Sequence, residues 1–438
     1  MSVKITIDDF FETQHRPYAI YDTARSIANV VDGQKITSRK VLHTCLIRTN
    51  EQIKVAQLCS QVAYETEYHH GEAGIGGVIC NLAQDFTGSN NINLLEPIGQ
   101  FGSRLSPIPA AHRYIFTKLS QSFKTIFKDE DRVILEHLYE DDKKIEPKYF
   151  LPIIPVILIN GSQGIGTGYA SKVLSYNPTD LKNDIIAILN GTERTTLIPW
   201  YKGYRGLISS GDNPNQWVFK GKLEIVNSTT IRITELPIGM FLDDIKAVLN
   251  KLKESDDIRD YDDNSTENGF DIEVKVARTT SAMNLDALYT KFKLISRDTE
   301  NLTLWDVSGK LQNFLNASSI VDYFVNFRLV KYEERRLKWI DIVKLEISDL
   351  TEKIRFIDFY IENSNHFKNL SKPELLKYLQ SNGFINGDKL IMMPIYSLTK
   401  DKIAELNTSL KTKEKELKRL IGTTAKKMYM SELNSLTF

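Results

Sequence analysis

Arg113 and Tyr114 are adjacent residues whose side chains have the chemistry needed to cut a phosphodiester. A tyrosine phenol can attack phosphorus and form a covalent phosphotyrosine, which preserves the energy of the broken strand. An arginine guanidinium can hold the non-bridging oxygens with paired N–H donors while negative charge builds on them. The pair alone is weak evidence, because most of the 19 tyrosines of this chain must serve other purposes. The surrounding sequence therefore decides the interpretation.

Five ordered sequence blocks surround this pair. They cover residues 25–42, 68–72, 82–95, 99–120 and 152–168. In order and wording the blocks resemble the DNA breakage-reunion core of type IIA topoisomerases. The stretch Tyr-His-His-Gly-Glu at 68–72 is similar to the eukaryotic and viral branch. Bacterial gyrase-like chains typically read Tyr-His-Pro-His-Gly at this point.

The resemblance implies catalytic roles for three side chains. Tyr114 matches the nucleophile, whose product in the family is a 5′-phosphotyrosyl bond. Arg113 matches the group that stabilises the transition state, and a simple phosphate contact is its alternative role. His70 matches the histidine expected to bond near the scissile phosphate.

The resemblance also implies a DNA-binding surface. Arg25, Lys35 and Arg39 match the DNA-binding loop and helix of the family, in which Asp32 would order the loop. His69 is expected to orient the loop that carries His70, and it is counted among the DNA-binding residues.

A local excess of basic residues points the same way. Residues 38–47 form a short amphipathic segment whose basic residues lie away from its apolar face. The stretch from 35 to 54 has one acidic residue, Glu51, and five cations: Lys35, Arg39, Lys40, Arg48 and Lys54. Such a cluster is often only a solvated face, but inside this set of motifs we predict phosphate contacts.

Ile165 matches the family residue that wedges between base pairs. An apolar wedge partly unstacks a base step and kinks duplex DNA. The flanking glycines, Gly164 and Gly166, are expected to let the backbone approach DNA closely. The alternative is an ordinary loop hydrophobe.

Two departures from the family pattern stand out. The Leu and Pro of the family sequence Asp-Gly-Leu-Lys-Pro are Gln34 and Ile36 here. The helix expected after His70 contains three glycines, at positions 74, 76 and 77. Each weakens a helix by about 1 kcal/mol relative to alanine, which predicts a looser helix.

The hydrophobic pattern predicts an α+β multidomain chain. Residues 1–172 are mostly helical, and the resemblance implies a winged-helix DNA-cleavage domain there. Residues 173–315 show alternating strand patterns at 204–209, 217–221, 222–226, 230–234 and 270–276, with a helical stretch at 285–295. This indicates a separate α/β domain, which matches the tower domain of the family.

Residues 316–438 contain two heptad seams. The first is formed by Leu337, Ile340, Val343, Ile347, Leu350, Ile354, Ile357 and Ile361, and the second runs from Ile403 to Leu420. They predict antiparallel coiled-coil arms at about 318–361 and 398–425, around a small tip at about 362–397. The resemblance implies that this helical tip dimerises and serves as an exit gate.

Composition excludes several classes of protein. Its 42% hydrophobic and 26% charged residues are typical of a globular protein, and 56 basic residues balance 56 acidic ones. No apolar run reaches the ~18 residues of a membrane span, and no signal-peptide core begins the chain. Cys45, Cys59 and Cys80 lack metal-like spacing and fit a reducing compartment. We therefore expect a cytoplasmic protein with no membrane partner.

Parts of the type IIA machinery are missing from the sequence. It has no phosphate-binding glycine loop, and we expect neither the Asp-x-Asp metal motif of a Toprim domain nor a DNA-wrapping β-pinwheel. We therefore expect a separate ATPase/Toprim subunit that binds ATP and holds most of the ligands of Mg²⁺. A core divided in this way resembles the medium subunit of T4-like phage topoisomerases, which implies an infected bacterial host. It also resembles the corresponding core of eukaryotic topoisomerase II.

The resulting prediction is the DNA-cleaving subunit of an ATP-dependent type IIA topoisomerase. As a homodimer it would break double-stranded DNA transiently, pass a second duplex through the break, and relax or decatenate DNA. One alternative is a gyrase-type A subunit without its wrapping domain, which would introduce supercoils. The other is a non-catalytic DNA-bending scaffold, which would form no covalent link to labelled DNA.

Overall fold

The computed structural model describes residues 5–48 and 51–438, and it has a mixed α/β fold with 49% helix and 18% strand. Two units share the chain. The first comprises Met1–Arg328 with Glu432–Phe438, and the second comprises Leu329–Ser431.

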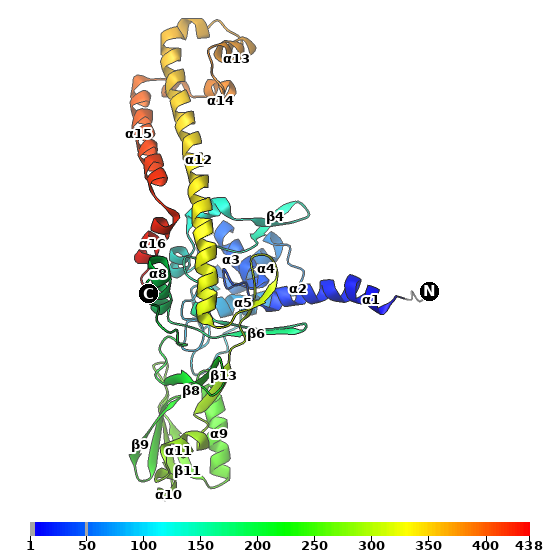
Figure 1. Ribbon diagram of the computed structural model, residues 1–438, viewed down its shortest axis with the longest axis vertical. Helices are drawn as coiled ribbons and strands as arrows, with labels where there is room; N and C mark the ends of the chain where they lie inside the picture. Colours follow the sequence, from blue (N-terminus) through cyan, green and yellow to red (C-terminus); the bar gives the residue numbers. More distant parts are fainter. Residues whose placement is uncertain (1–4, 49–50) are drawn as a thin grey trace. The chain divides into compact units, whose positions relative to one another are not determined.

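The first unit begins with helices, drawn in blue in Figure 1. They are α1 (Ile7–Phe10), the π-helical turn η1 (Phe11–His15), α2 (Arg16–Ser26), α3 (Ile36–Arg48), α4 (Val55–Glu65) and α5 (Glu72–Ala83). Helix α3 is buried on several sides, because Arg39, Lys40 and His43 lie inside the fold together with Val41 and Leu42. The predicted amphipathic segment with outward basic residues is therefore wrong.

Three short strand pairs and four further helical segments belong to the same part of the chain. Strand β1 (Ile53–Lys54) pairs with β2 (Phe116–Thr117), β3 (His137–Glu140) with β4 (Lys143–Pro147), and β5 (Ser162–Gly166) with β6 (Tyr169–Val173). The helices in this part are α6 (Gln121–Ile126), the 3-10 turn η2 (Asp129–Ile134), α7 (Val156–Asn160) and α8 (Pro178–Asn190). Each of the three pairs is antiparallel, and β4 packs against α3 while β5 packs against α2.

Two further sheets fill the middle of the sequence. One has the order β11-β12-β10-β9 and the other β13-β8-β7, while β14 pairs with β15. The strands are β7 (Leu207–Ser210), β8 (Gln216–Lys220), β9 (Lys222–Asn227), β10 (Thr230–Glu235), β11 (Ile258–Asp263), β12 (Ile272–Val276), β13 (Ile295–Thr299), β14 (Thr303–Trp305) and β15 (Leu311–Asn313). The strands predicted in this region are confirmed, whereas β11, β13, β14 and β15 had no recognised signal.

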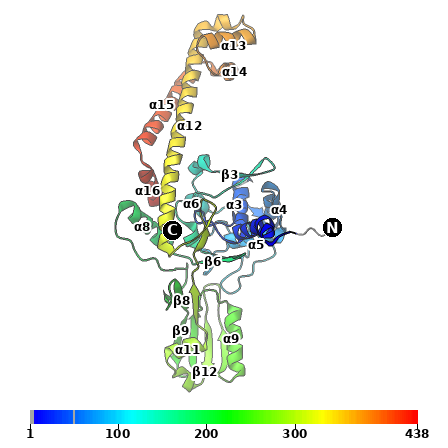
Figure 2. The same ribbon diagram turned by 45° about the vertical axis from the view of Figure 1, so that its right-hand side comes forward.

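One apolar core holds the four-stranded sheet. Its buried members include Ile231 and Val274 from the strands and Ile245 and Leu249 from α9 (Leu242–Glu254). Figure 2 shows α9 running along this sheet. The remaining helices here are α10 (Arg278–Ser281) and α11 (Leu285–Lys291), so the predicted helix at 285–295 ends earlier and Ile295 begins β13.

The second unit is helical. Most of α12 (Ala317–Phe367) belongs to it, with α13 (Lys372–Ser381), α14 (Gly387–Ile391), the 3-10 turn η3 (Ile395–Ser397), α15 (Lys400–Gly422) and most of α16 (Ala425–Ser435). Ile340 and Val343 of the first predicted seam are buried with Leu420 of the second. Leu337 is 50% exposed, so the first seam begins later than predicted. A separate apolar cluster around Phe356 and Leu379 joins α12 to α13.

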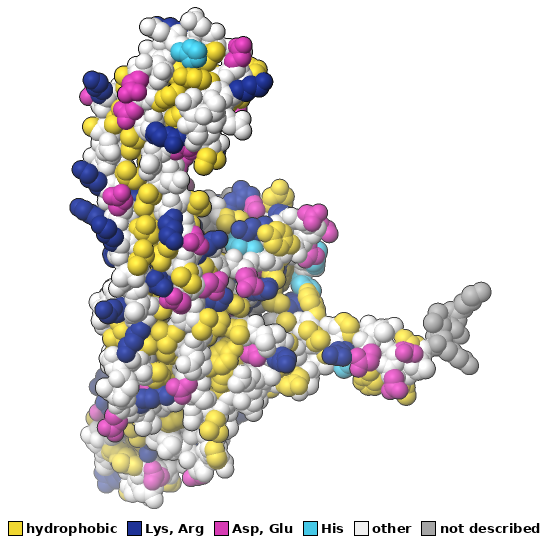
Figure 3. All heavy atoms as spheres, turned by 45° about the horizontal axis from the view of Figure 1, so that its top comes forward, with side chains coloured by type: hydrophobic (Ala, Val, Ile, Leu, Met, Phe, Trp, Pro, Cys, Tyr) yellow, Lys and Arg dark blue, Asp and Glu magenta, His cyan; other side chains and the backbone are white. Residues whose placement is uncertain are grey.

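Charge is mixed on the face drawn in Figure 3, where dark blue basic and magenta acidic side chains are interspersed. This agrees with the balanced composition. Among the described helices, none has the length and apolar character needed to cross a bilayer. All three cysteines are buried and free, as their isolated positions predict.

Candidate active site

The turn at residues 111–115, called the tyrosine turn below, is held by the beginning of α4. The first amides of an α-helix have no partner within the helix. Here the amide of Val55 donates to the Ile115 carbonyl at 3.0 Å, and the amide of Ala56 donates to the His112 carbonyl at 3.2 Å. The pairing of β1 with β2 continues this attachment. The backbone around Tyr114 is thus fixed to a helix end.

Arg113 and Tyr114 point their side chains outward from this turn. Tyr114 is 67% exposed, and Arg113 is exposed as well. The guanidinium carbon of Arg113 lies 4.8 Å from the centroid of the Tyr114 ring. A cation at this distance from an aromatic face is attracted to it. The predicted nucleophile and its cation are therefore adjacent and open to a large ligand.

His70 is oriented by aromatic neighbours. Its Nε2 is hydrogen-bonded to the hydroxyl of Tyr21 on α2, and its ring meets the Tyr68 ring edge-on at 5.4 Å. Desolvation, followed by the charges of Arg25 and His69, lowers the pKa of His70. This shift favours the neutral imidazole. In the described geometry it bonds Tyr21 rather than the two residues of the tyrosine turn.

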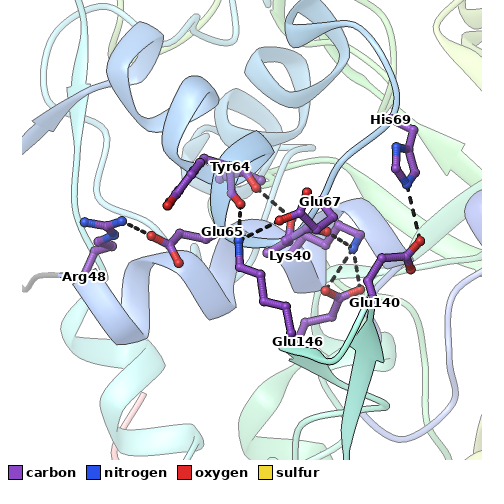
Figure 4. A network of polar contacts seen from close by, with 11 residues as sticks. Lys40, Arg48, Tyr64, Glu65, Glu67, His69, Glu140 and Glu146 are labelled. Atoms are coloured by element: carbon purple, nitrogen blue, oxygen red, sulfur yellow. Dashed lines mark hydrogen bonds and ion pairs between the residues drawn. The ribbon is translucent and has the colours of Figure 1, made fainter.

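Charged side chains from α3 and from the β3–β4 hairpin contact the loop at residues 66–70, called the histidine loop below (Figure 4). Lys40 donates to the Thr66 carbonyl at 2.7 Å and pairs with Glu146 at 2.9 Å. Lys143 pairs with Glu67 at 2.7 Å. His69 is exposed, and its Nε2 lies 3.5 Å from Glu140 of β3. The β3–β4 hairpin thus contacts the histidine loop directly through Lys143 and Glu140, and its Glu146 holds Lys40 against Thr66.

Arg39 forms a second buried pair. Its Nε lies 2.8 Å from Oδ2 of Asp32, and its Nη2 lies 3.2 Å from Oδ1. Asp32 also accepts the amides of Gln34 at 3.0 Å and of Phe150 at 2.9 Å. A two-pronged arrangement of this kind orders a loop strongly. Gln34, one of the departures from the family pattern, is part of the same network.

These contacts correct the prediction that Arg39 and Lys40 bind phosphates. Their exposed fractions are 6% and 8%, and each is paired with a carboxylate inside the fold. A cation buried with its counter-ion cannot reach a phosphate unless that pair is broken. Arg48, at the end of α3, is also paired, with Glu65. Two of the five cations in the predicted basic cluster, Arg39 and Lys40, are therefore internal, whereas Arg48 is paired at the surface.

Three other cations face outward or nearly so. Lys54 of β1 is exposed, next to the strand that follows Tyr114. Arg25 is half-buried, with its guanidinium carbon 5.6 Å from the Tyr21 ring centroid. Lys35 is half-buried and donates to the Gln163 carbonyl at 2.6 Å, while burial lowers its pKa. These three cations are open, or partly open, to a phosphate.

Ile165 lies on the β5–β6 hairpin and is 78% exposed. Asp22 of α2 holds the hairpin turn, because its Oδ2 accepts the Thr167 amide at 2.7 Å and the Thr167 hydroxyl at 2.8 Å. A Cβ at Gly164 would overlap the Ser26 carbonyl. The glycine is therefore needed for close packing on α2, and its role in an approach to DNA stays a prediction.

Arg104, which lies in the block at 99–120 but had no role assigned from the sequence, anchors the loop before the tyrosine turn. It is 9% exposed and donates to the carbonyls of Met240 at 2.8 Å, Leu236 at 2.8 Å and Pro237 at 3.1 Å. Its Nη2 also lies 3.4 Å from Oε1 of Glu235. The segment that presents Tyr114 is thus attached to the end of β10.

Replacing Arg104 with alanine is expected to destabilise the chain by about 3 kcal/mol or more. The change leaves a buried carboxylate and several carbonyls without their donor. Denaturant unfolding followed by circular dichroism measures the loss. Arg132→Ala is the matched control, because that side chain is 54% exposed and pairs with the equally open Asp129. It should change stability by less than about 1 kcal/mol, and equal losses in both variants would contradict the anchor.

Low pH is expected to lower the stability of the fold through protonation of His43. Burial, followed by the charges of His137, Lys144 and Lys40, lowers its pKa to about 4. In the unfolded chain the pKa is about 6.5, so the unfolded state binds the proton first. The free energy of unfolding is therefore expected to fall as pH drops from about 6.5 to about 4, by on the order of 3 kcal/mol from this group. Urea unfolding at several pH values, compared between the wild type and His43→Gln, measures it. Identical pH slopes would exclude His43 as the cause.

The described part of this chain holds no preformed cluster of metal ligands. No three His, Cys, Asp or Glu side chains gather there as a metal site. Two triplets of the form Asp-x-Asp do occur, at residues 129–131 and 260–262. Asp131 is paired with the buried Arg328 at 2.9 Å, and Asp260 with Lys253 at 2.8 Å. Both triplets are therefore used in ion pairs.

Several known proteins are similar to this chain in sequence. A family model that describes the A subunit of DNA gyrase/topoisomerase IV matches residues 25–435. DNA topoisomerase 2 of Plasmodium falciparum is 36% identical over 98% of this chain and 34% of its own length. DNA topoisomerase 2 top-2 of Caenorhabditis elegans is 38% identical over 86% of this chain and 25% of its own length. The chain thus spans about a third or less of these relatives.

A solved structure is similar over nearly the whole chain. The crystal structure of the DNA-binding, cleavage and re-ligation domain of Plasmodium falciparum topoisomerase II superposes with a TM-score of 0.92. The two sequences are 36% identical, and the match covers 97% of this chain and 63% of that one. The fold of this chain is therefore similar to that of a solved DNA-binding, cleavage and re-ligation domain.

Proposed function

This chain belongs to the family of DNA gyrase/topoisomerase IV A subunits and has a type IIA breakage-reunion core, and from that premise we propose that it cleaves duplex DNA with Tyr114. The observation that carries the proposal is the tyrosine turn. Its backbone is fixed by α4, while Arg113 and Tyr114 project together into solvent. Such an arrangement presents a nucleophile and a cation to a ligand too large for a pocket.

The reaction balances as an exchange of esters. Oη of Tyr114 attacks the phosphorus and loses its proton, and the bond between phosphorus and O3′ breaks. O3′ leaves and takes up a proton, so that the 5′ end of the cut strand is held on the tyrosine. Arg113 holds the non-bridging oxygens as charge builds on them. Re-ligation is the reverse attack by the 3′ hydroxyl. His70, held by Tyr21, is assigned to the scissile phosphate, where its ring N–H donates a hydrogen bond to a phosphate oxygen.

The DNA surface is built from the outward residues. Arg25, Lys35, Lys54 and His69 contact phosphates, and Ile165 enters the base stack. Arg39 and Lys40 act on DNA only through the loops that their buried pairs hold. This surface is supported by exposure and charge, and it uses fewer cations than the sequence cluster contains.

Ile165→Ala is expected to reduce DNA bending more than DNA affinity. The phosphate contacts remain, but the side chain that fills the opened base step is lost. Fluorescence transfer between dyes at the two ends of a short duplex measures bending, and a titration measures affinity. Ile108→Ala, a change at a hydrophobe that is 73% exposed, is the control. Unchanged end-to-end distance in the Ile165 variant would contradict the wedge.

The domain roles follow the family. Residues 1–172 act as the winged-helix cleavage domain and residues 173–315 as the tower. The arms of α12 and α15 carry a tip at about 362–397 that pairs with a second copy. Two copies cut the two strands, hold the ends while another duplex passes, and let it leave between the arms. The apolar cluster that organises the tip and the packed seam of Ile340, Val343 and Leu420 support this division.

ATP and Mg²⁺ are assigned to an ATPase/Toprim partner subunit. The described residues offer no metal site beside Tyr114, which supports a partner that supplies the carboxylates. As in the T4-like phage enzymes that the sequence resembles, the complex would work in an infected bacterial cell during DNA replication. With the partner and ATP it is expected to relax and decatenate DNA. Introduction of negative supercoils instead would favour the gyrase-type alternative.

The test of this function uses DNA labelled at the 5′ or the 3′ end. The chain is mixed with its partner and Mg²⁺, the reaction is stopped with denaturant, and protein-linked DNA is separated. A 5′-phosphotyrosyl bond is expected to link the newly formed 5′ ends to protein and leave free 3′ hydroxyls. Bent DNA without any linkage would favour the scaffold alternative.

A further inference from the structure

The side chains of Arg113 and Tyr114 face outward, so their neighbours must set the direction in which they point. The two flanking residues of the tyrosine turn that pack inward are His112 and Ile115. Ile115 is 1% exposed, and its Cγ2 would lie only 3.1 Å from a Cβ at Gly99. The His112 ring covers Gly76 of α5, where a Cβ would overlap the imidazole. Each inward side chain therefore lies against a glycine.

Gly76 differs from the other two glycines of α5. A Cβ at Gly77 would meet nothing within 4 Å, and one at Gly74 would meet only the Tyr68 hydroxyl at 3.6 Å. Glycine in a helix interior destabilises the helix relative to alanine, so a glycine there indicates a steric requirement. At position 76 the reason is room for the His112 ring. The three glycines therefore do not simply make a loose helix.

His112 is held from two directions. Its carbonyl accepts the Ala56 amide at the start of α4, and its ring rests on α5. Helix α5 begins at Glu72, directly after His70 and Gly71. His112 therefore connects the helix that follows the histidine loop with the residue that precedes Arg113.

We infer that His112 is a positioning residue, whose ring seated on Gly76 sets the direction of Arg113 and Tyr114 toward the scissile phosphate. The inference rests on the proposed role of Tyr114. His112 acts on the rate by placing Arg113 and Tyr114, because a displacement of about 1 Å at a reacting group can cost on the order of a hundredfold in rate.

The experiment compares Gly76→Ala with Gly77→Ala in the complex with the ATPase/Toprim subunit. The two substitutions add the same methyl group to the same helix, and only the first displaces His112. Single-turnover cleavage at saturating DNA is expected to slow by about tenfold or more in Gly76→Ala, with the Kd for DNA unchanged. Gly77→Ala is expected to cleave at the wild-type rate.

His112→Ala provides the second arm and does not depend on whether Gly76→Ala folds. We expect a similar loss, and no further loss in the double variant, because both changes remove one contact. The loss should be the same from about pH 6 to about pH 9, since the ring acts by position rather than by proton transfer.

Equal cleavage by Gly76→Ala and Gly77→Ala would overturn the inference, as would a wild-type rate for His112→Ala. Losses that multiply in the double variant, or a changed pH profile, would also overturn it. If the wild-type complex forms no covalent link, the proposed function fails and this inference fails with it. If the wild type cleaves and the variants match it, only the inference fails.

Discussion

No covalent protein–DNA complex should form when Tyr114 is replaced by phenylalanine. The change removes one oxygen atom, the atom that attacks phosphorus. Because the ring is 67% exposed and contacts Arg113 through its face, the fold and the DNA surface should remain as they are. Cleavage is expected to fall by at least about 10⁴-fold, in line with the loss of a nucleophile in other enzymes.

The measurement is denaturant-resistant linkage of the variant complex to end-labelled DNA, with Kd measured in parallel. Tyr64→Phe is a matched control, because Tyr64 is a similarly exposed tyrosine, at 69%, on α4. It should cleave like the wild type. Residual linkage in Tyr114→Phe, or an equal loss in Tyr64→Phe, would remove Tyr114 from its assigned role.

Arg113→Ala should have the next largest effect. Losing one donor that stabilises transition-state charge typically costs about 3 kcal/mol, which is on the order of a hundredfold in rate. The guanidinium rests on the Tyr114 ring at 4.8 Å and is exposed, so its removal should not disturb the fold. We expect slower cleavage and slower re-ligation, with little change in Kd.

Arg113→Lys separates the two roles open to this residue. Lysine keeps the charge but not the forked pair of donors, so it should restore only part of the rate. Single-turnover rates at saturating DNA, together with Kd, make the distinction. A variant that binds less tightly but cleaves at the wild-type rate would reduce Arg113 to a phosphate contact.

Sequence patterns located the tyrosine turn and the long helices, since those depend on local signals. The Arg-Tyr pair is exposed as its chemistry requires, and the seam around Ile340 and Val343 is packed. Both features follow from residue type and spacing within a short stretch. The secondary structure of the central sheets was also largely predictable, because alternation marks half-buried strands.

The charged residues of α3 could not be placed in this way. Arg39 and Lys40 look like a solvent-facing pair, but Glu146, the partner of Lys40, lies 106 residues away in the sequence. Arg104 likewise finds its acceptors 132 and 136 residues away. Burial of such cations depends on tertiary contacts, and a cation count along a chain cannot distinguish an internal ion pair from a DNA contact.

The glycines show the same limit. The sequence predicted a freely approaching backbone at Gly164 and a loose helix around Gly76. Each glycine makes room for a neighbour distant in sequence, which is Ser26 for Gly164 and His112 for Gly76. A missing side chain reports that something approaches closely, but the sequence does not say what approaches.

The central claim is that Tyr114 becomes covalently joined to DNA, and peptide mapping tests it most directly. The chain, its ATPase/Toprim partner, Mg²⁺ and duplex DNA are trapped with denaturant, and nuclease and protease then reduce the product to a nucleotide-bearing peptide. Mass spectrometry should place a 5′-linked nucleotide on Tyr114 and on no other residue. A nucleotide on a different side chain, or its absence in a reaction that relaxes DNA, would contradict the account.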